Sequence, residues 1–166
     1  DPGDGSDVVE GQAGLDELIF NGSSANEIFD LAANGGRLRF ARNVGNIVLD
    51  LDDVEKVSLT AASGTDTVVV NNLAGTDVTL INIGLAGTAG SMGDASADSI
   101  IVNATSGDDV VIVSGDAGGT TVLGLAATIN VFVAETSLDR LTVNLLGGND
   151  VLDASGLAAN GIALTG

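Results

Sequence analysis

Cysteine, histidine, tryptophan and tyrosine are all absent from this chain of 166 residues. Without cysteine, neither a disulfide framework nor a cysteine-ligated zinc site can form. Without histidine, the Ser-His and Cys-His nucleophile systems and imidazole metal ligands are excluded as well. The aromatic residues that remain are four phenylalanines, which leave little material for stacking bases or sugars. The available chemistry is that of carboxylates, and we expect the chain not to be an enzyme.

Basic residues are also scarce. Five Lys and Arg residues face 23 Asp and Glu residues, which gives a formal net charge of -18. Such a charge repels nucleic acid and anionic membrane surfaces, and no apolar run approaches the roughly 18 to 20 residues of a membrane span. We therefore expect neither nucleic-acid binding nor membrane insertion. Calcium, which takes carboxylate and carbonyl oxygens as ligands, is the partner that this charge favours, although solubility alone would also account for the charge.

Two series of short motifs recur along the chain. The first has the form small-x-acid-x-apolar at 14–18, 53–57, 96–100 and 137–141, and its acids recur at intervals of 39, 43 and 41: Asp16, Glu55, Asp98 and Asp139. The second follows ten or eleven positions later at 24–28, 64–68, 107–111 and 148–152, and its polar residues recur at intervals of 40, 43 and 41: Asn26, Asp66, Asp109 and Asp150. Because both series lengthen together in the middle, the chain consists of four copies of a unit of about 41 residues, a length typical of repeat proteins.

Each unit supplies about four short β-like runs separated by Gly, Asn, Ser and Asp. The repetition predicts an all-β fold, a parallel β-solenoid of about eight coils in which equivalent residues stack. The acids of the first series should then align in one file, and Asn71, Asn103 and Asn144 should form an asparagine ladder. An antiparallel β-sandwich is the alternative, since the same alternation would serve it. We expect residues 1–166 to form one domain, a fragment of a longer repeat array.

The N-terminal segment resembles the RTX, or haemolysin-type, nonapeptide G-G-x-G-x-D-x-U-x. Two copies occupy residues 1–19, reading Pro2 to Glu10 and Gly11 to Ile19, and residues 20–166 resemble degenerate repeats of the same kind. The resemblance implies that calcium binds at the glycine turns, through the residues Asp4, Gly5, Asp7, Gly14 and Asp16. The isolated G-x-D echoes extend this expectation to Asp109 and Asp150. The other reading of these aspartates is that each caps its own turn.

The resemblance also implies a location and a role. RTX proteins are secreted by a type I system and fold outside the cell, where calcium is plentiful. We accordingly expect a structural module of an adhesin, surface-layer or filament protein, which self-associates end to end. The alternative is a carbohydrate-binding or polysaccharide-active module with a cell-surface glycan as its ligand, in which neighbours such as Asp50, Asp52, Asp53 and Glu55 would supply an acid pair.

Two further groups of residues carry expectations. Arg37 and Arg39 alternate with Leu38 and Phe40 and should face solvent, either to receive an acidic partner or to pair with acids on adjacent coils. Arg42 belongs to the same basic segment. The spacing of the four phenylalanines predicts that they stack in the core: Phe20, Phe29, Phe40 and Phe132.

Overall fold

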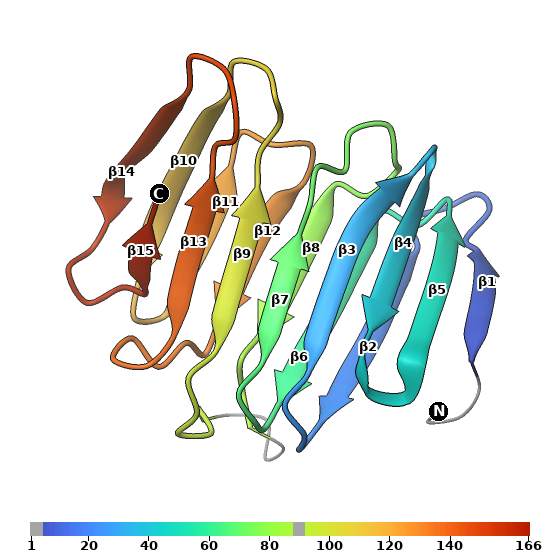
Figure 1. Ribbon diagram of the computed structural model, residues 1–166, viewed down its shortest axis with the longest axis horizontal. Coiled ribbons are helices and arrows are strands. Elements are labelled where there is room, and N and C mark those ends of the chain that lie inside the picture. The colour runs from blue at the N-terminus through green and yellow to red at the C-terminus, as the bar shows by residue number, and fades with distance from the viewer. Residues whose placement is uncertain (1–4, 88–91) are drawn as a thin grey trace.

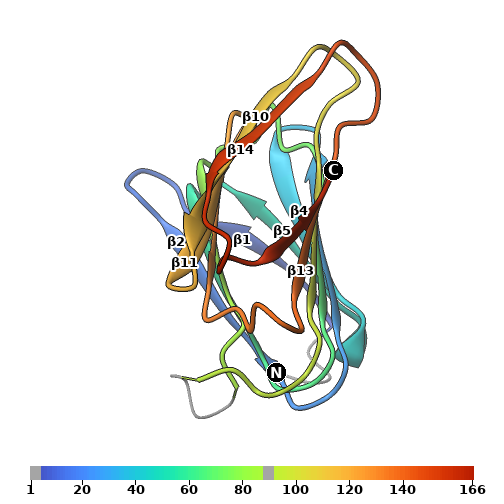
Figure 2. The ribbon, with the colours of Figure 1, turned by 90° about the vertical axis from the view of Figure 1, so that its left-hand side faces the viewer.

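The computed structural model describes residues 5–87 and 92–166 as two β-sheets that face each other (Figures 1 and 2). Sheet A has eight strands, in the spatial order β1 (Ser6–Glu10), β5 (Ile47–Asp52), β4 (Arg37–Arg42), β3 (Ile28–Asn34), β7 (Thr67–Val70), β9 (Ser99–Asn103), β13 (Arg140–Asn144) and β15 (Ala163–Thr165). Sheet B has seven strands, in the order β14 (Val151–Leu157), β10 (Val110–Asp116), β11 (Gly119–Leu123), β12 (Thr128–Phe132), β8 (Leu80–Gly84), β6 (Lys56–Ala62) and β2 (Glu17–Ser23). A 3-10 turn, Val44–Asn46, joins β4 to β5. The all-β prediction is confirmed.

Most neighbouring strands run in the same direction. Among the described residues, nine strand pairings are parallel and four are antiparallel. The antiparallel sandwich is therefore excluded. The described part of the chain also contains no helix that could span a membrane.

The antiparallel pairings belong to two meanders, and they correct the prediction that all neighbouring strands run the same way. Strands β3, β4 and β5 form one meander in sheet A, and β10, β11 and β12 form the other in sheet B. Each begins with a two-residue turn, Gly35-Gly36 or Ala117-Gly118. Gly35 has a φ of +66°. Glycine adopts this conformation without strain, which favours the tight two-residue turn at Gly35-Gly36.

The core lies between the sheets and follows from the alternation of each strand. In β7, for example, Val68 and Val70 are buried while Thr67 and Val69 lie on the outer face. Three phenylalanines cluster as predicted, with the ring centroids of Phe20 and Phe40 4.7 Å apart and those of Phe20 and Phe29 6.0 Å apart. The prediction was wrong for Phe132, whose side chain lies on the outer face at the end of β12 with 42% of the residue exposed.

The strand order repeats after seven strands, with the two sheets exchanged. The parallel pairs β2–β6, β3–β7 and β6–β8 correspond to β9–β13, β10–β14 and β13–β15, and the two meanders correspond to each other. From β2 to β9 the chain crosses between the sheets five times, at β2–β3, β5–β6, β6–β7, β7–β8 and β8–β9. Because this number is odd, the second half of the chain begins in the opposite sheet.

Candidate functional site

Four acidic residues form a continuous file where the chain enters sheet A. They directly precede β3, β7, β9 and β13, and each is at most 2% exposed: Glu27, Asp66, Asp98 and Asp139. The backbone N–H of Glu27 donates to Asp66 Oδ1 at 2.8 Å, that of Asp66 to Asp98 Oδ1 at 2.8 Å, and that of Asp98 to Asp139 Oδ1 at 2.9 Å. We call these four residues the acid file.

Burial sets the electrostatics of the acid file. Desolvation raises the pKa of Asp98 to about 7, and the neighbouring charges of Asp139 and Asp66 add to the rise. Desolvation likewise raises the pKa of Asp66 to about 6, and it raises the pKa of Asp139. The hydrogen bonds from backbone N–H groups act in the opposite direction at all three carboxyls and limit the rise.

One cation offsets the first carboxylate of the file. Arg42, at the end of β4, is buried and forms a hydrogen-bonded ion pair with Glu27. Glu27 also accepts the backbone N–H of Ser23 at 2.7 Å. The Oδ2 atom of Asp66 is buried and has no hydrogen-bond partner in the part of the chain that the structure describes.

The file differs from the predicted one. Asp16 and Glu55 precede strands of sheet B, whereas Asp98 and Asp139 precede strands of sheet A, so the first series does not align in a single file. The five sheet crossings explain this split, because they carry the second half of each series into the other sheet. Asp16 instead stacks on Glu55, whose Oε2 accepts the Asp16 N–H at 2.8 Å.

The residues predicted to bind calcium lie at separate places. Gly5 has a φ of +86° and precedes β1, and Asp7 is exposed on β1 in sheet A. Asp16 leads into β2 in sheet B, with Oδ2 buried and unpartnered beside the turn at Gly14, whose φ is +151°. Asp4 lies outside the described residues. The structure thus places Asp7 and Asp16 on different sheets, where they do not form one ligand set.

Asp109 and Asp150 stack on each other in sheet B. Asp150 Oδ1 accepts the Asp109 N–H at 2.9 Å, and Asp109 Oδ2 accepts the N–H and the hydroxyl of Thr105 at 2.9 and 2.8 Å. These are the contacts of aspartates that cap turns. Calcium ligation at the predicted positions stays a prediction.

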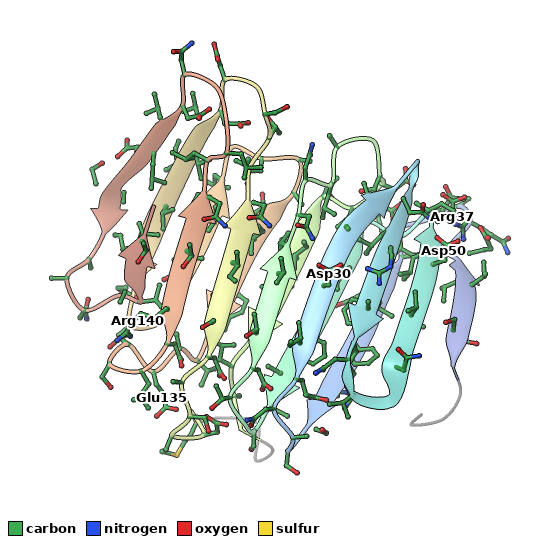
Figure 3. The ribbon with its side chains drawn as sticks, in the orientation of Figure 1. Asp30, Arg37, Asp50, Glu135 and Arg140 are labelled. Carbon is green, nitrogen blue, oxygen red and sulfur yellow. The ribbon has the colours of Figure 1, made fainter. Side chains whose placement is uncertain are left out.

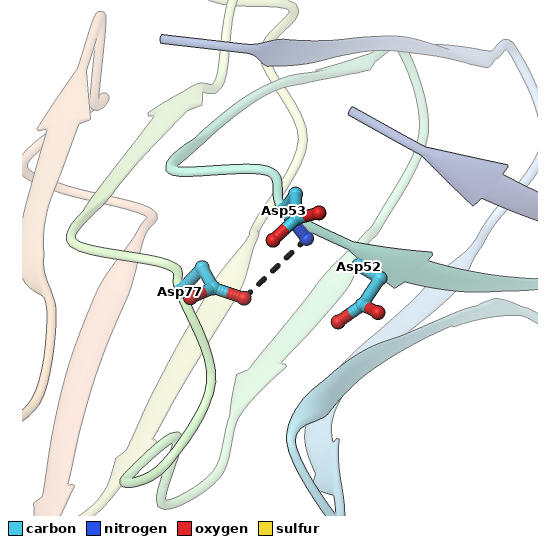
Figure 4. Close-up of side chains that lie close together, drawn as sticks. All are labelled: Asp52, Asp53 and Asp77. Carbon is cyan, nitrogen blue, oxygen red and sulfur yellow. Dashed lines mark hydrogen bonds between the residues drawn. The ribbon is translucent and has the colours of Figure 1, made fainter. Parts of the chain in front are cut away.

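A different acidic group has the spacing of a metal site. Asp52, Asp53 and Asp77 each offer an oxygen atom within 4.8 Å of the others (Figure 4). The Asp53 N–H donates to Asp77 Oδ2 at 3.4 Å, and partial desolvation together with the charges of Asp52 and Asp77 raises the pKa of Asp53. Asp77 lies 24 residues beyond Asp53 and belongs to neither motif series, so the repeats did not predict this group.

Arg37 and Arg39 are half-buried and pair with acids on neighbouring strands, as one of the two interpretations of the sequence predicted. Arg37 contacts Glu10, Asp50 and Asp52 at 2.9 to 3.1 Å, and it lies beside Asp50 at the β1 end of sheet A (Figure 3). Arg39 pairs with Asp30 at 2.8 Å. Asp50 and Asp52 are therefore held by a guanidinium group.

The predicted asparagine ladder is confirmed, and it is longer than predicted. Asn144 Nδ2 donates to Asn103 Oδ1 at 2.8 Å, and Asn103 Nδ2 donates to Asn71 Oδ1 at 2.9 Å. Asn71 Nδ2 donates in turn to Asp30 Oδ2 at 3.1 Å. The ladder ties β3, β7, β9 and β13 together on the outer face of sheet A.

Sequence reasoning missed one member of the acid file, Glu27, and its partner Arg42. Glu27 was not predicted because the second motif series assigned Asn26, the residue before it, as the equivalent of Asp66. Arg42 was grouped with the solvent-facing arginines, although it occupies an inward position of β4. In both cases the signal was the alternation of inward-facing and outward-facing residues along the adjoining strand. No family model, curated protein or solved structure matches the chain.

Proposed function

We propose that this chain is a structural module, a segment of parallel β-solenoid that acts as a stiff spacer in a secreted or cell-surface protein of the RTX type. The observation that carries the proposal is the stacking of like residues across successive strands of sheet A, in the acid file on one side and in the asparagine ladder on the other. The chain returns to sheet A again and again to add these rungs, which is how a solenoid grows.

The rungs account for the stiffness. Each step of the acid file joins a backbone N–H to a carboxyl oxygen of the residue that leads into the next strand, and such a hydrogen bond contributes about 0.5–1.5 kcal/mol. The amide ladder resists sliding of the same strands on the outer face, because a shift of register would break every rung at once. The two sets of bonds oppose bending along the axis of the stack.

The location and the role of calcium are parts of this proposal. A chain with a net charge of -18 gains from divalent cations that lower its self-repulsion, and secretion to a calcium-rich exterior would supply them. Calorimetric titration tests this directly. Heat of binding that is lost in Asp16→Asn and kept in the exposed variant Asp116→Asn supports a site at the glycine turn, and the absence of calcium binding removes calcium from the proposal.

The glycan-binding alternative has less support. Phe20, Phe29 and Phe40 pack against one another between the sheets, so they do not line a sugar-binding groove. Asp50 and Asp52 are paired with Arg37. A glycan array separates the two functions, because specific hits would favour the alternative and a blank array the spacer.

A distance measurement tests the spacer. Spin labels on Ser24→Cys and Asn160→Cys sit on exposed residues near opposite ends of the stack, and the chain has no cysteine of its own to compete. A stiff module gives one narrow distribution of distances that does not change with temperature below unfolding. A broad distribution would overturn the proposal.

A further inference from the structure

Within residues 5–87 and 92–166, the last strand at each end of the two sheets has one edge without a paired strand, and the hydrophobic residues beside it are only partly buried. In Figure 1 the N-terminal strands β1 and β2 lie at one end and the C-terminal strands β14 and β15 at the other, and each is the last strand of its sheet. The partly buried residues that pack on the core include Leu18 and Phe20 at the first end and Leu152 and Ala154 at the second. Unpaired edges above an open core favour the addition of further strands.

The seven-strand repeat specifies which strand fits on each edge. Strand β7 pairs in parallel with β9 in the middle of sheet A, and the equivalents of β7 and β9 are β14 and β2. Both lie in sheet B, at opposite ends, and the chain of pairings across that sheet makes them run in the same direction. A simple translation along the axis therefore brings β14 of one copy beside β2 of the next.

We propose that a second copy of this chain docks head to tail on the first, with β14 of one copy pairing in parallel with β2 of the other. The inference rests on the proposed solenoid, and it names the partner and the register. In the seven-strand repeat Val151 is equivalent to Thr67, and Glu17 is equivalent to Ser99. Because Thr67 lies opposite Ser99 in the pair β7–β9, Val151 of one copy lies opposite Glu17 of the next. The contact is heterologous, so it repeats along the axis and builds a filament.

The side chains at the two edges are complementary in this register. Leu152 and Ala154 of one copy come opposite Leu18 and Phe20 of the next, all on the inner face of sheet B. The small alanine leaves room for the phenylalanine ring. Docking removes these four partly exposed residues from water, which favours association.

The hydrogen bonds of the entry turns are complementary as well. At the β7–β9 junction the Asp66 N–H donates to the Asp98 carboxylate, and the Ser99 N–H donates to the Asp66 carbonyl at 2.9 Å. The equivalent groups across the new junction are the Asp150 N–H and the Asp16 carboxylate. Asp16 Oδ2 is buried and lacks a hydrogen-bond partner among the described residues of the single chain.

In sheet A, β15 of one copy and β1 of the next copy would occupy the same position, because both are equivalent to β8. Strand β15 lies beside β13 as β8 lies beside β6, and β1 lies beside β5 as β8 lies beside β12. In that place β15 turns Leu164 toward the core, opposite Leu141. Strand β1 places Val9 on the same inner face, opposite Leu51, but also Asp7, opposite Leu49, and Asp7 is exposed in the single chain. Since a buried carboxylate in an apolar core is costly, β15 of one copy takes the place and β1 of the next is displaced.

Cysteine cross-linking tests the register on the full chain. Val151→Cys protein is mixed with Glu17→Cys protein under mild oxidation, and the matched control mixes Val151→Cys with Ile19→Cys, which lies on the same outer face but two residues away. We expect a disulfide-linked heterodimer in the first mixture, formed several-fold faster than in the control. Equal rates in both mixtures, or a sedimentation profile that stays monomeric at high concentration, would overturn the docking.

Hydrogen exchange tests the strand displacement, and the spin-label distance separates the two proposals. On association, the amides of residues 17–23 in β2 should exchange more slowly, and those of residues 6–10 in β1 should exchange faster. Unchanged hydrogen exchange in both segments would contradict the displacement of β1. A chain that remains monomeric but keeps one narrow distance between Ser24→Cys and Asn160→Cys would refute the docking and leave the spacer intact. A broad distance with efficient cross-linking would refute the spacer alone.

Discussion

Replacing Asp98 by asparagine should make the fold less sensitive to pH and more stable at neutral pH. Asp98 is 2% exposed, and its Oδ1 accepts the Asp66 N–H at 2.8 Å. Asparagine keeps an acceptor oxygen at this position and removes the charge. The comparison therefore isolates the cost of ionising a carboxyl inside the acid file.

The sign follows from the direction of the pKa shift. Burial raises the pKa of Asp98 from 3.8 to about 7. Between these values the folded state binds more protons than the unfolded state, so the free energy of unfolding falls as pH rises through this window. A difference of one pKa unit between the folded and unfolded states is worth about 1.36 kcal/mol, so the pKa change of Asp98 corresponds to about 4 kcal/mol in the free energy of unfolding. Roughly 2–3 kcal/mol of this stability is lost between pH 5 and 7. Asp66, with its pKa raised to about 6, contributes with the same sign.

The variant also has a cost. The new amide group brings N–H donors into a buried position, and an unsatisfied donor costs about 1–3 kcal/mol. At pH 8 the variant should still be more stable than the parent by about 1–3 kcal/mol, and this advantage should shrink by roughly 2–3 kcal/mol on going down to pH 5.

Urea unfolding followed by circular dichroism between pH 5 and 8.5 measures these differences. Asp7→Asn is the matched control, because it makes the same change in net charge at an exposed residue, and it should follow the parent at every pH. Two results would refute the reasoning: the same pH slope in Asp98→Asn as in the parent, or a parent whose stability increases from pH 5 to pH 7.

Three other substitutions probe the ion pair, the turns and the core. Arg42→Met leaves the Glu27 carboxylate buried and unpaired, so it should cost about 3–5 kcal/mol in urea unfolding, and the double variant with Glu27→Gln should recover much of the loss. Gly64 has a φ of +121°, and a Cβ there would lie 2.7 Å from the Ala25 carbonyl oxygen, whereas a Cβ at Gly36 would meet no atom nearer than 3.8 Å. Gly64→Ala should therefore cost on the order of 2–3 kcal/mol, and Gly36→Ala should be close to neutral. Leu59 is a core residue with 2% exposure. Leu59→Ala should lower the free energy of unfolding by about 2–5 kcal/mol, and a loss below about 1 kcal/mol would contradict the assigned core.

The local features of the fold were accessible from the sequence because they depend on short patterns. The alternation in Thr67–Val70 identifies a strand and its inner face. The recurrence of the two motif series identifies the stacks within each half, except that it assigns Asn26 where Glu27 stacks on Asp66. The asparagine ladder was found for the same reason, since Asn71, Asn103 and Asn144 each follow the last apolar residue of their strand.

The exchange of sheets was not accessible from the repeat alone. It depends on whether the segments after Asn34 and Asp116 cross to the other sheet or fold back in the same one. Both fold back, through Gly35-Gly36 and Ala117-Gly118. The pair Gly35-Gly36 between two apolar runs is a recognised hairpin signal and predicts this meander when it is given its due weight. The repeat gives the number of residues between equivalent positions, but it does not give the number of times that the chain crosses between the two sheets. That number decides which acids align in one file.

Nuclear Overhauser effects from the Ile100 backbone amide test the central claim, that the chain stacks by parallel strands with its second half exchanged between the sheets. In the structure Ile100 of β9 lies between Val68 of β7 and Leu141 of β13 in sheet A. We therefore expect interstrand signals from Ile100 to its neighbours on these two strands, in a parallel register. Signals that instead connect Ile100 to Val57 of β6, its counterpart in the first series, would contradict the account.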